Sequence, residues 1–189
     1  MKRQITTLIH TTTMRILRVG LMSSLATAGP VLASESAHDS HDTSPAKLVQ
    51  IVREATRQYI DVNAATAAGY GPAFGCVSGP DHGAMGVHYV NGPLVGDGEI
   101  DASRPEALIY EPSGDQRRLV GVEFIVDAQT WLASHNNTPP MLEGQAFQLV
   151  GSPNRYNLPA FFELHVWAWR TNPNGAFVDW NNQVTCERQ

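Results

Sequence analysis

The chain has 189 residues, with 13 basic and 18 acidic side chains, so its formal net charge at pH 7 is −5. The length suits one ordinary domain with a short leader segment. Only one lysine, Lys47, lies beyond residue 33. A basic surface that binds phosphate groups is therefore not expected, and we do not predict nucleic acid as a partner.

Residues 1–33 have the composition of a signal peptide. The segment 14–18 is compact and basic, 19–28 is apolar or small, and 31–33 forms a small-x-small cleavage site. The residues before Met14 are too rich in threonine and histidine for an apolar region, so we expect Met14 to be the true initiator. The apolar run falls well short of the ~20 residues that cross a membrane. We therefore predict a cleaved leader and a mature protein that is periplasmic or secreted and does not span the membrane.

The two cysteines, Cys76 and Cys186, both belong to the predicted mature chain. In an oxidising compartment, two cysteines at opposite ends of a domain favour a disulfide bond. Closing a loop of roughly a hundred residues would stabilise the fold by about 4 to 5 kcal/mol in the chain-entropy model. The alternative is that one cysteine acts as a thiolate ligand or nucleophile, but no Cys-x-x-Cys motif supports it.

The mature chain is expected to contain a disordered polar tail over residues 34–43 and a single globular domain over residues 44–189. Ser44 supplies a helix N-cap and Pro45 a first-turn residue. Apolar residues then recur at three- and four-residue spacing, namely Leu48, Ile51, Val52, Ala55, Tyr59, Val62 and Ala65. The pattern predicts an amphipathic helix that ends near Gly69.

Beyond this helix, glycine, proline and asparagine separate short β-rich segments. The predicted strands are 86–91, 107–111, 118–127, 145–151, 159–170 and 176–180, and a short helix is expected over 127–134. The turn 172–175 is expected to join the last two strands as a hairpin. The predicted fold is α+β, with the N-terminal amphipathic helix packed on a mostly antiparallel β-sheet.

Side-chain alternation along two of these strands assigns polar residues to one sheet face. In the strand 118–127, the expected core face carries Val120, Val122, Phe124 and Val126, and Glu123 points to the other side. In the strand 159–170, the corresponding opposite face carries Glu163, His165, Trp167 and Trp169. If both apolar faces cover the helix, these polar side chains meet on the far side of the sheet, framed by the two tryptophans.

A carboxylate within an apolar strand is costly unless it is paired or coordinated, so Glu123 and Glu163 each require a partner. His165 is one candidate, and His88 is another if its strand has the matching register. His82 lies in the adjacent glycine-rich loop. Three imidazoles with one or two carboxylates suit Zn²⁺ or Cu²⁺. The leading hypothesis is therefore an exported metal-binding protein.

Two other classes of function are compatible with the same residues. One is a metal-free small-molecule-binding domain, or an acid/base enzyme, that uses a pocket lined by Trp167 and Trp169. The other is a structural or interaction module without a site, in which His82 is a turn residue and His88 a core histidine. There is no Gly-x-Ser-x-Gly elbow, phosphate-binding loop or dinucleotide fingerprint to indicate a further class.

Four segments resemble a group of exported bacterial proteins of no established activity. They are Gly86–Asn91 (GVHYVN), Pro105–Pro112 (PEALIYEP), Leu119–Val126, and Leu158–Trp169 (LPAFFELHVWAW) with the turn that follows it. The resemblance covers most of the predicted mature chain. It implies export, but no activity, cofactor or site residue.

Overall fold

The computed structural model describes residues 46–187, so the predicted signal peptide and the polar tail lie outside the described residues. The first helix begins at Lys47 with Ala46 in the N-cap position, so the expectation of an N-cap at Ser44 was wrong. The helical elements are α1 (Lys47–Thr56), the 3-10 helix η1 (Arg57–Ile60), α2 (Val62–Ala67), α3 (Gly92–Asp97) and α4 (Ala128–Ser134). The strands are β1 (Gly71–Gly79), β2 (Gly83–Val90), β3 (Ala107–Ser113), β4 (Gln116–Asp127), β5 (Met141–Leu142), β6 (Gln145–Ala146), β7 (Gln148–Val150) and β8 (Phe161–Val166). Within residues 46–187, no helix has the length and hydrophobicity needed to cross a membrane.

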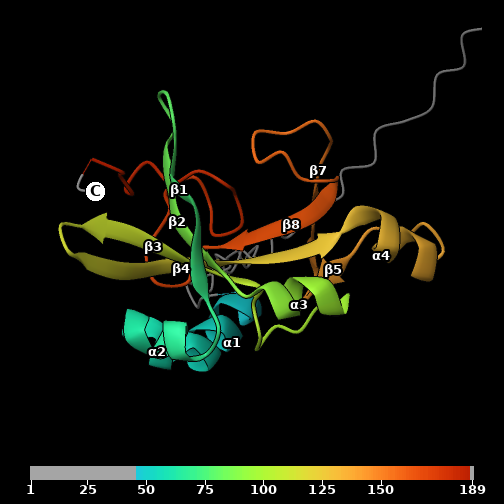
Figure 1. Ribbon diagram of the computed structural model, residues 1–189, viewed down its shortest axis with the longest axis horizontal. Helices are drawn as coiled ribbons and strands as arrows, with labels where there is room; N and C mark the ends of the chain where they lie inside the picture. Colours follow the sequence, from blue (N-terminus) through green and yellow to red (C-terminus); the bar gives the residue numbers. More distant parts are fainter. Residues whose placement is uncertain (1–45, 188–189) are drawn as a thin grey trace, which may run out of the picture. The chain divides into compact units, whose positions relative to one another are not determined.

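Six strands form one antiparallel sheet in the order β1-β2-β3-β4-β8-β7, and β5 and β6 form a separate two-stranded sheet. The α+β class with an antiparallel sheet is therefore confirmed. Helices α1 and α2 lie along one side of the sheet, whereas the loop between β7 and β8 and the C-terminal segment lie on the other (Figure 1). The sheet thus has one face covered by helices and one covered by irregular chain.

The segment expected to form one helix up to Gly69 is divided into α1, η1 and α2. The break has a local cause. The side chain of Asp61 accepts a hydrogen bond from the backbone N–H of Asn63 and so caps a new helix, α2. Gly69, with φ of 94°, directly follows the last turn.

The main hydrophobic core lies between the helices and the sheet. Its buried members include Leu48, Val52, Leu108, Tyr110, Phe124, Leu164 and Val166. A β-bulge where β3 pairs with β4 breaks the alternation, because Ile109 pairs with Gly121 but Tyr110 pairs with Leu119. As a result, Leu119 joins the main core and Val120 packs on the opposite face. The prediction that Val120 shares the face of Val122 was wrong for this reason.

The two ends of the sheet region also differ from the prediction. Strand β1 was not predicted, because its sequence begins Gly-Pro and contains three glycines. Residues 176–180 form turns and bends instead of a strand, and the backbone N–H of Trp167 donates to the carbonyl oxygen of Ala176 over 2.9 Å.

A disulfide bond between Cys76 and Cys186 ties the C-terminal segment to β1, as expected from the cysteine count.

Candidate metal centre

The sheet face opposite the helices carries a cluster of buried polar side chains. Residues paired across antiparallel strands share a face, and Glu123 of β4 pairs with His165 of β8 on one side and with Ala107 of β3 on the other. Because Ala107 has only a methyl group, His88 of β2 can reach Glu123 across β3. His88 Nε2 lies 3.3 Å from Glu123 Oε2, and the rings of His88 and His165 are 5.8 Å apart, edge to face.

A second set of contacts extends the cluster through Glu163, which shares a hydrogen bond with Glu123. Gln148 Nε2 donates to Asp179 Oδ2 over 2.6 Å and lies 3.5 Å from Glu163 Oε1. Asp179 Oδ1 in turn lies 3.6 Å from His165 Nδ1. The polar groups are therefore linked from His165 through Asp179, Gln148 and Glu163 to Glu123.

The two imidazoles are buried and neutral. His165 is 1% exposed and His88 is 5% exposed. Burial lowers the pKa of His165 to about 3, and burial together with the neighbouring His165 lowers the pKa of His88 to about 3. Neither ring nitrogen of His165 has a hydrogen-bond partner among residues 46–187. Buried polar atoms are rarely left without a partner, so the ring nitrogens of His165 are candidate ligand atoms.

The carboxyl groups of the cluster hold their protons more tightly than exposed ones. Burial, and next the charge of Glu163, raises the pKa of Glu123 well above its usual value. Burial also raises the pKa of Glu163 and that of Asp179. Two adjacent buried carboxyl groups resist ionising together without a compensating cation, which agrees with the raised pKa values of Glu123 and Glu163.

Two sets of side chains bring potential metal ligands together. His88, Glu123 and His165 form one, Glu163, His165 and Asp179 form the other, and within each set the ligand atoms lie within 4.8 Å of one another. Ligands of zinc lie about 2.0 to 2.2 Å from the ion, so ligand atoms at opposite sides of one ion are at most about 4.4 Å apart. Small side-chain adjustments would therefore suffice to coordinate an ion. Neutral imidazoles with carboxylates fit the ligand preferences of Zn²⁺ and Cu²⁺.

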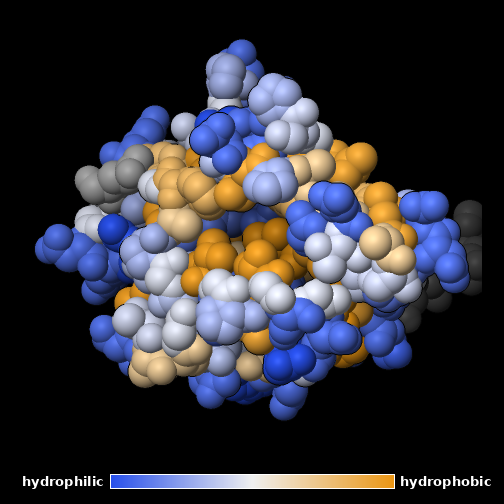
Figure 2. All heavy atoms as spheres, turned by 45° about the vertical axis from the view of Figure 1, so that its right-hand side comes forward, coloured by the Kyte–Doolittle hydropathy of each residue, from blue (hydrophilic) through white to orange (hydrophobic). Residues whose placement is uncertain are grey.

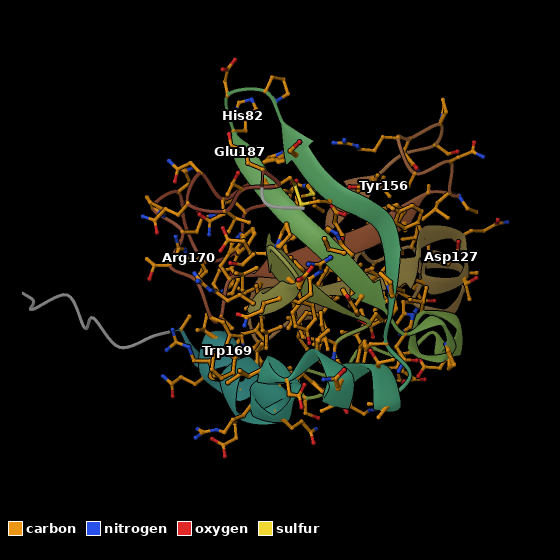
Figure 3. All side chains as sticks on the ribbon, turned by 60° about the vertical axis from the view of Figure 1, so that its left-hand side comes forward. His82, Asp127, Tyr156, Trp169, Arg170 and Glu187 are labelled. Atoms are coloured by element: carbon orange, nitrogen blue, oxygen red, sulfur yellow. A yellow bond between two sulfur atoms is a disulfide. The ribbon has the colours of Figure 1, made fainter. Side chains whose placement is uncertain are left out.

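His82 does not join these groups. It is exposed near the tip of the β1–β2 hairpin (Figure 3), and its ring lies 6.5 Å from that of Trp180. It lines a surface hollow that Asp179 also lines. The sequence pattern placed His82 near a strand entrance but could not show that the hairpin carries it outward.

The two tryptophans lie on opposite faces of the sheet. The ring of buried Trp167 lies 6.3 Å from that of His165, and its indole N–H donates to the carbonyl of Val178. Strand β8 ends at Val166, however, and the chain then turns, so alternation stops. Trp169 lies beside the helices in Figure 3, and its indole N–H donates to Thr56 Oγ1 over 3.0 Å. Neither Trp167 nor Trp169, both expected to line a pocket, is among the residues that line an apolar hollow beside the cluster.

The apolar hollow that opens beside the cluster has an enclosed volume of about 40 Å³. Its lining combines aromatic and aliphatic side chains with two members of the cluster: Phe74, His88, Val90, Glu123, Ile125, Tyr156, Leu158 and Phe161. Asp179, Gln148 and Tyr156 were not predicted as site residues. Asp179 and Tyr156 come from irregular segments and Gln148 from the short edge strand β7, where sequence periodicity gives no sign of direction.

The chain matches no known protein-family model, no curated protein and no solved structure. The chemistry of the cluster therefore has to be interpreted from its own residues and contacts.

Proposed function

We propose that the protein binds one transition-metal ion through His88, His165 and Glu123, and that this ion is Zn²⁺. The observation that carries this proposal is the buried imidazole of His165, whose ring nitrogens lack hydrogen-bond partners among the described residues while carboxyl groups lie nearby. Zn²⁺ has no geometric preference from its d electrons, so it tolerates a compact set of two nitrogens and one oxygen. Cu²⁺ binds similar ligands and is the competing ion.

The remaining polar side chains would orient the ligands. Imidazoles that bind metals commonly point their second ring nitrogen at a carboxylate, which fixes the ring and its tautomer. Asp179 has this position relative to His165 Nδ1, and Gln148 holds Asp179. Glu163 would neutralise part of the added positive charge, because a bound cation lowers the raised pKa values of Glu123 and Glu163 and so favours their ionised forms.

We also propose that the mature protein works in the periplasm or outside the cell. The leader over residues 1–33 supports this, since it has the order of a signal peptide. The disulfide bond between Cys76 and Cys186 agrees with an oxidising compartment.

A second function rests on the hydrogen bond between Glu123 and Glu163. Paired carboxyl groups with raised pKa values can act as general acid and base near neutral pH. In that case the chain would be a metal-free acid/base enzyme, with His88 positioned by its contact with Glu123.

Zinc titration of the full chain distinguishes the two functions. The protein is stripped with a chelator and titrated against a chromophoric competitor, and we expect one zinc ion per chain. His165→Leu removes a ligand and should weaken binding at least a hundredfold, whereas Asp179→Asn removes an orienting group and should weaken it by about tenfold. The matched controls are His82→Leu and His135→Leu, since both histidines are exposed and lie outside the cluster.

The Asp179→Asn variant keeps the test informative if His165→Leu does not fold, because the side chain of Asp179 is partly exposed. Zinc binding that survives both of these substitutions, or that is lost in His82→Leu, would contradict the proposed site. A chain that binds no zinc or copper at all would leave the acid/base function as the better interpretation.

A further inference from the structure

The apolar hollow beside the cluster has the features of a binding site for an organic molecule. Its walls are mainly hydrophobic, and the His88 and Glu123 side chains among them are both 5% exposed. Binding pockets for small molecules combine apolar walls with a few buried polar groups that fix orientation. His88 and Glu123, whose side chains lie 3.3 Å apart, supply the polar groups beside these walls.

The mouth of the hollow is built from exposed aromatic and aliphatic side chains. Phe74 is 54% exposed and its ring lies 5.2 Å from that of Tyr156, and Leu158 is 37% exposed. Exposed large hydrophobic side chains gain most from a partner that covers them. Figure 2 shows hydrophobic residues gathered around a recess in the surface.

The backbone at this mouth is strained. Phe74 has φ of 61°, in a region that favours glycine, and Gly75 follows with φ of 66°. The strain coincides with a β-bulge between Ala73 and Cys76. Strained backbone persists where surrounding structure holds it, and such positions concentrate at binding sites. Here the disulfide of Cys76 anchors the strand directly beyond the bulge.

We propose that this hollow binds a small, uncharged, mainly apolar molecule, whose single oxygen or nitrogen atom faces His88 and Glu123. A charged molecule is disfavoured because the lining contains no lysine or arginine and Glu123 is the only acidic residue in it. The enclosed space is small, about 40 Å³, so only one end of the molecule enters it and the exposed side chains at the mouth cover the rest.

Only the contact of the molecule's polar end depends on the proposed function, which is zinc binding. A zinc ion held by three protein ligands keeps a further position for an outside ligand. The oxygen or nitrogen atom of the bound molecule would take that position, whereas the apolar walls would hold the rest of it in either case.

The test uses para-fluorophenol as the probe and fluorine NMR of the full chain, with and without zinc. We expect saturable binding in both forms and tighter binding with zinc. Phe74→Ala removes one wall and Ile125→Phe fills the hollow, so each should weaken binding at least tenfold. Leu149→Ala is the matched control, because Leu149 is 57% exposed and does not line the hollow.

The outcomes separate this inference from the proposed function. No binding of para-fluorophenol to a chain that binds zinc would overturn the inference and leave the metal site standing. The inference is also overturned if Phe74→Ala and Ile125→Phe bind the probe as tightly as Leu149→Ala does. Binding of para-fluorophenol to a chain that takes up no metal would instead contradict the proposed function alone.

Discussion

Glu106 provides a stability test that is independent of any metal, because it is a buried carboxyl group outside both candidate ligand sets. The residue is only 2% exposed, and its Oε2 accepts a hydrogen bond from the backbone N–H of Ile125 over 2.9 Å. Burial raises the pKa of Glu106 from 4.5 to about 8, with a smaller contribution from Asp97, while the Ile125 bond and Arg104 act in the opposite direction.

The sign of the effect follows from linkage. The pKa is higher in the folded than in the unfolded chain, so the contribution of Glu106 to stability is fully present below about pH 4.5 and is lost as the pH rises through about 8. With about 1.4 kcal/mol for each pH unit, the loss between about pH 5 and pH 8 is at most about 3.5 kcal/mol. Relaxation around the ionised carboxylate reduces this, so we expect about 2 to 3 kcal/mol.

The assay is urea unfolding of the oxidised chain near pH 5 and near pH 8, for the wild type and for Glu106→Gln. The amide keeps an acceptor for the Ile125 N–H but cannot ionise, so the variant should gain about 2 to 3 kcal/mol relative to the wild type on going to the higher pH. The control is Glu99→Gln, because Glu99 is exposed. Parallel pH profiles for the wild type and Glu106→Gln would refute the reasoning.

Two further predictions concern the scaffold. In the native oxidised chain, thiol labelling should find neither Cys76 nor Cys186 reactive, and replacing both by alanine should cost about 2 to 5 kcal/mol in urea unfolding; labelling of both would contradict the disulfide. Gly83→Ala should destabilise strongly, by more than about 2 kcal/mol, because its Cβ would lie 2.2 Å from the carbonyl oxygen of Asn181. Gly144→Ala has nearly the same φ but open space, so an equal loss in both variants would show that the close approach to Asn181 is not responsible.

The part of the site that the sequence predicted depends on regular strands. Glu123, Glu163 and His165 could be assigned to one face because β4 and β8 keep strict alternation where they pair. The same rule failed at Val120, where a bulge adds a residue, and at Trp169, which follows the end of β8. Bulges and strand ends are set by contacts between distant segments, so local periodicity does not reveal them.

The part that the sequence did not predict comes from segments without periodicity. Asp179 reaches the cluster from turns that the disulfide and the hydrogen bond from Trp167 to Val178 help to hold. Tyr156 belongs to the loop between β7 and β8. His82 is the opposite case. It is close to His88 in the sequence, but it belongs to neither set of potential metal ligands. Residue type alone could identify these side chains as candidates, but only tertiary structure could select among them.

Anomalous diffraction at the zinc edge, from crystals of the zinc-loaded chain, tests the central claim most directly. The proposed metal site predicts one strong peak about 2 to 2.2 Å from ring nitrogens of His88 and His165 and from an oxygen of Glu123. A peak at the surface beside His82, or a zinc-loaded chain with no peak on the buried face of the sheet, would contradict it.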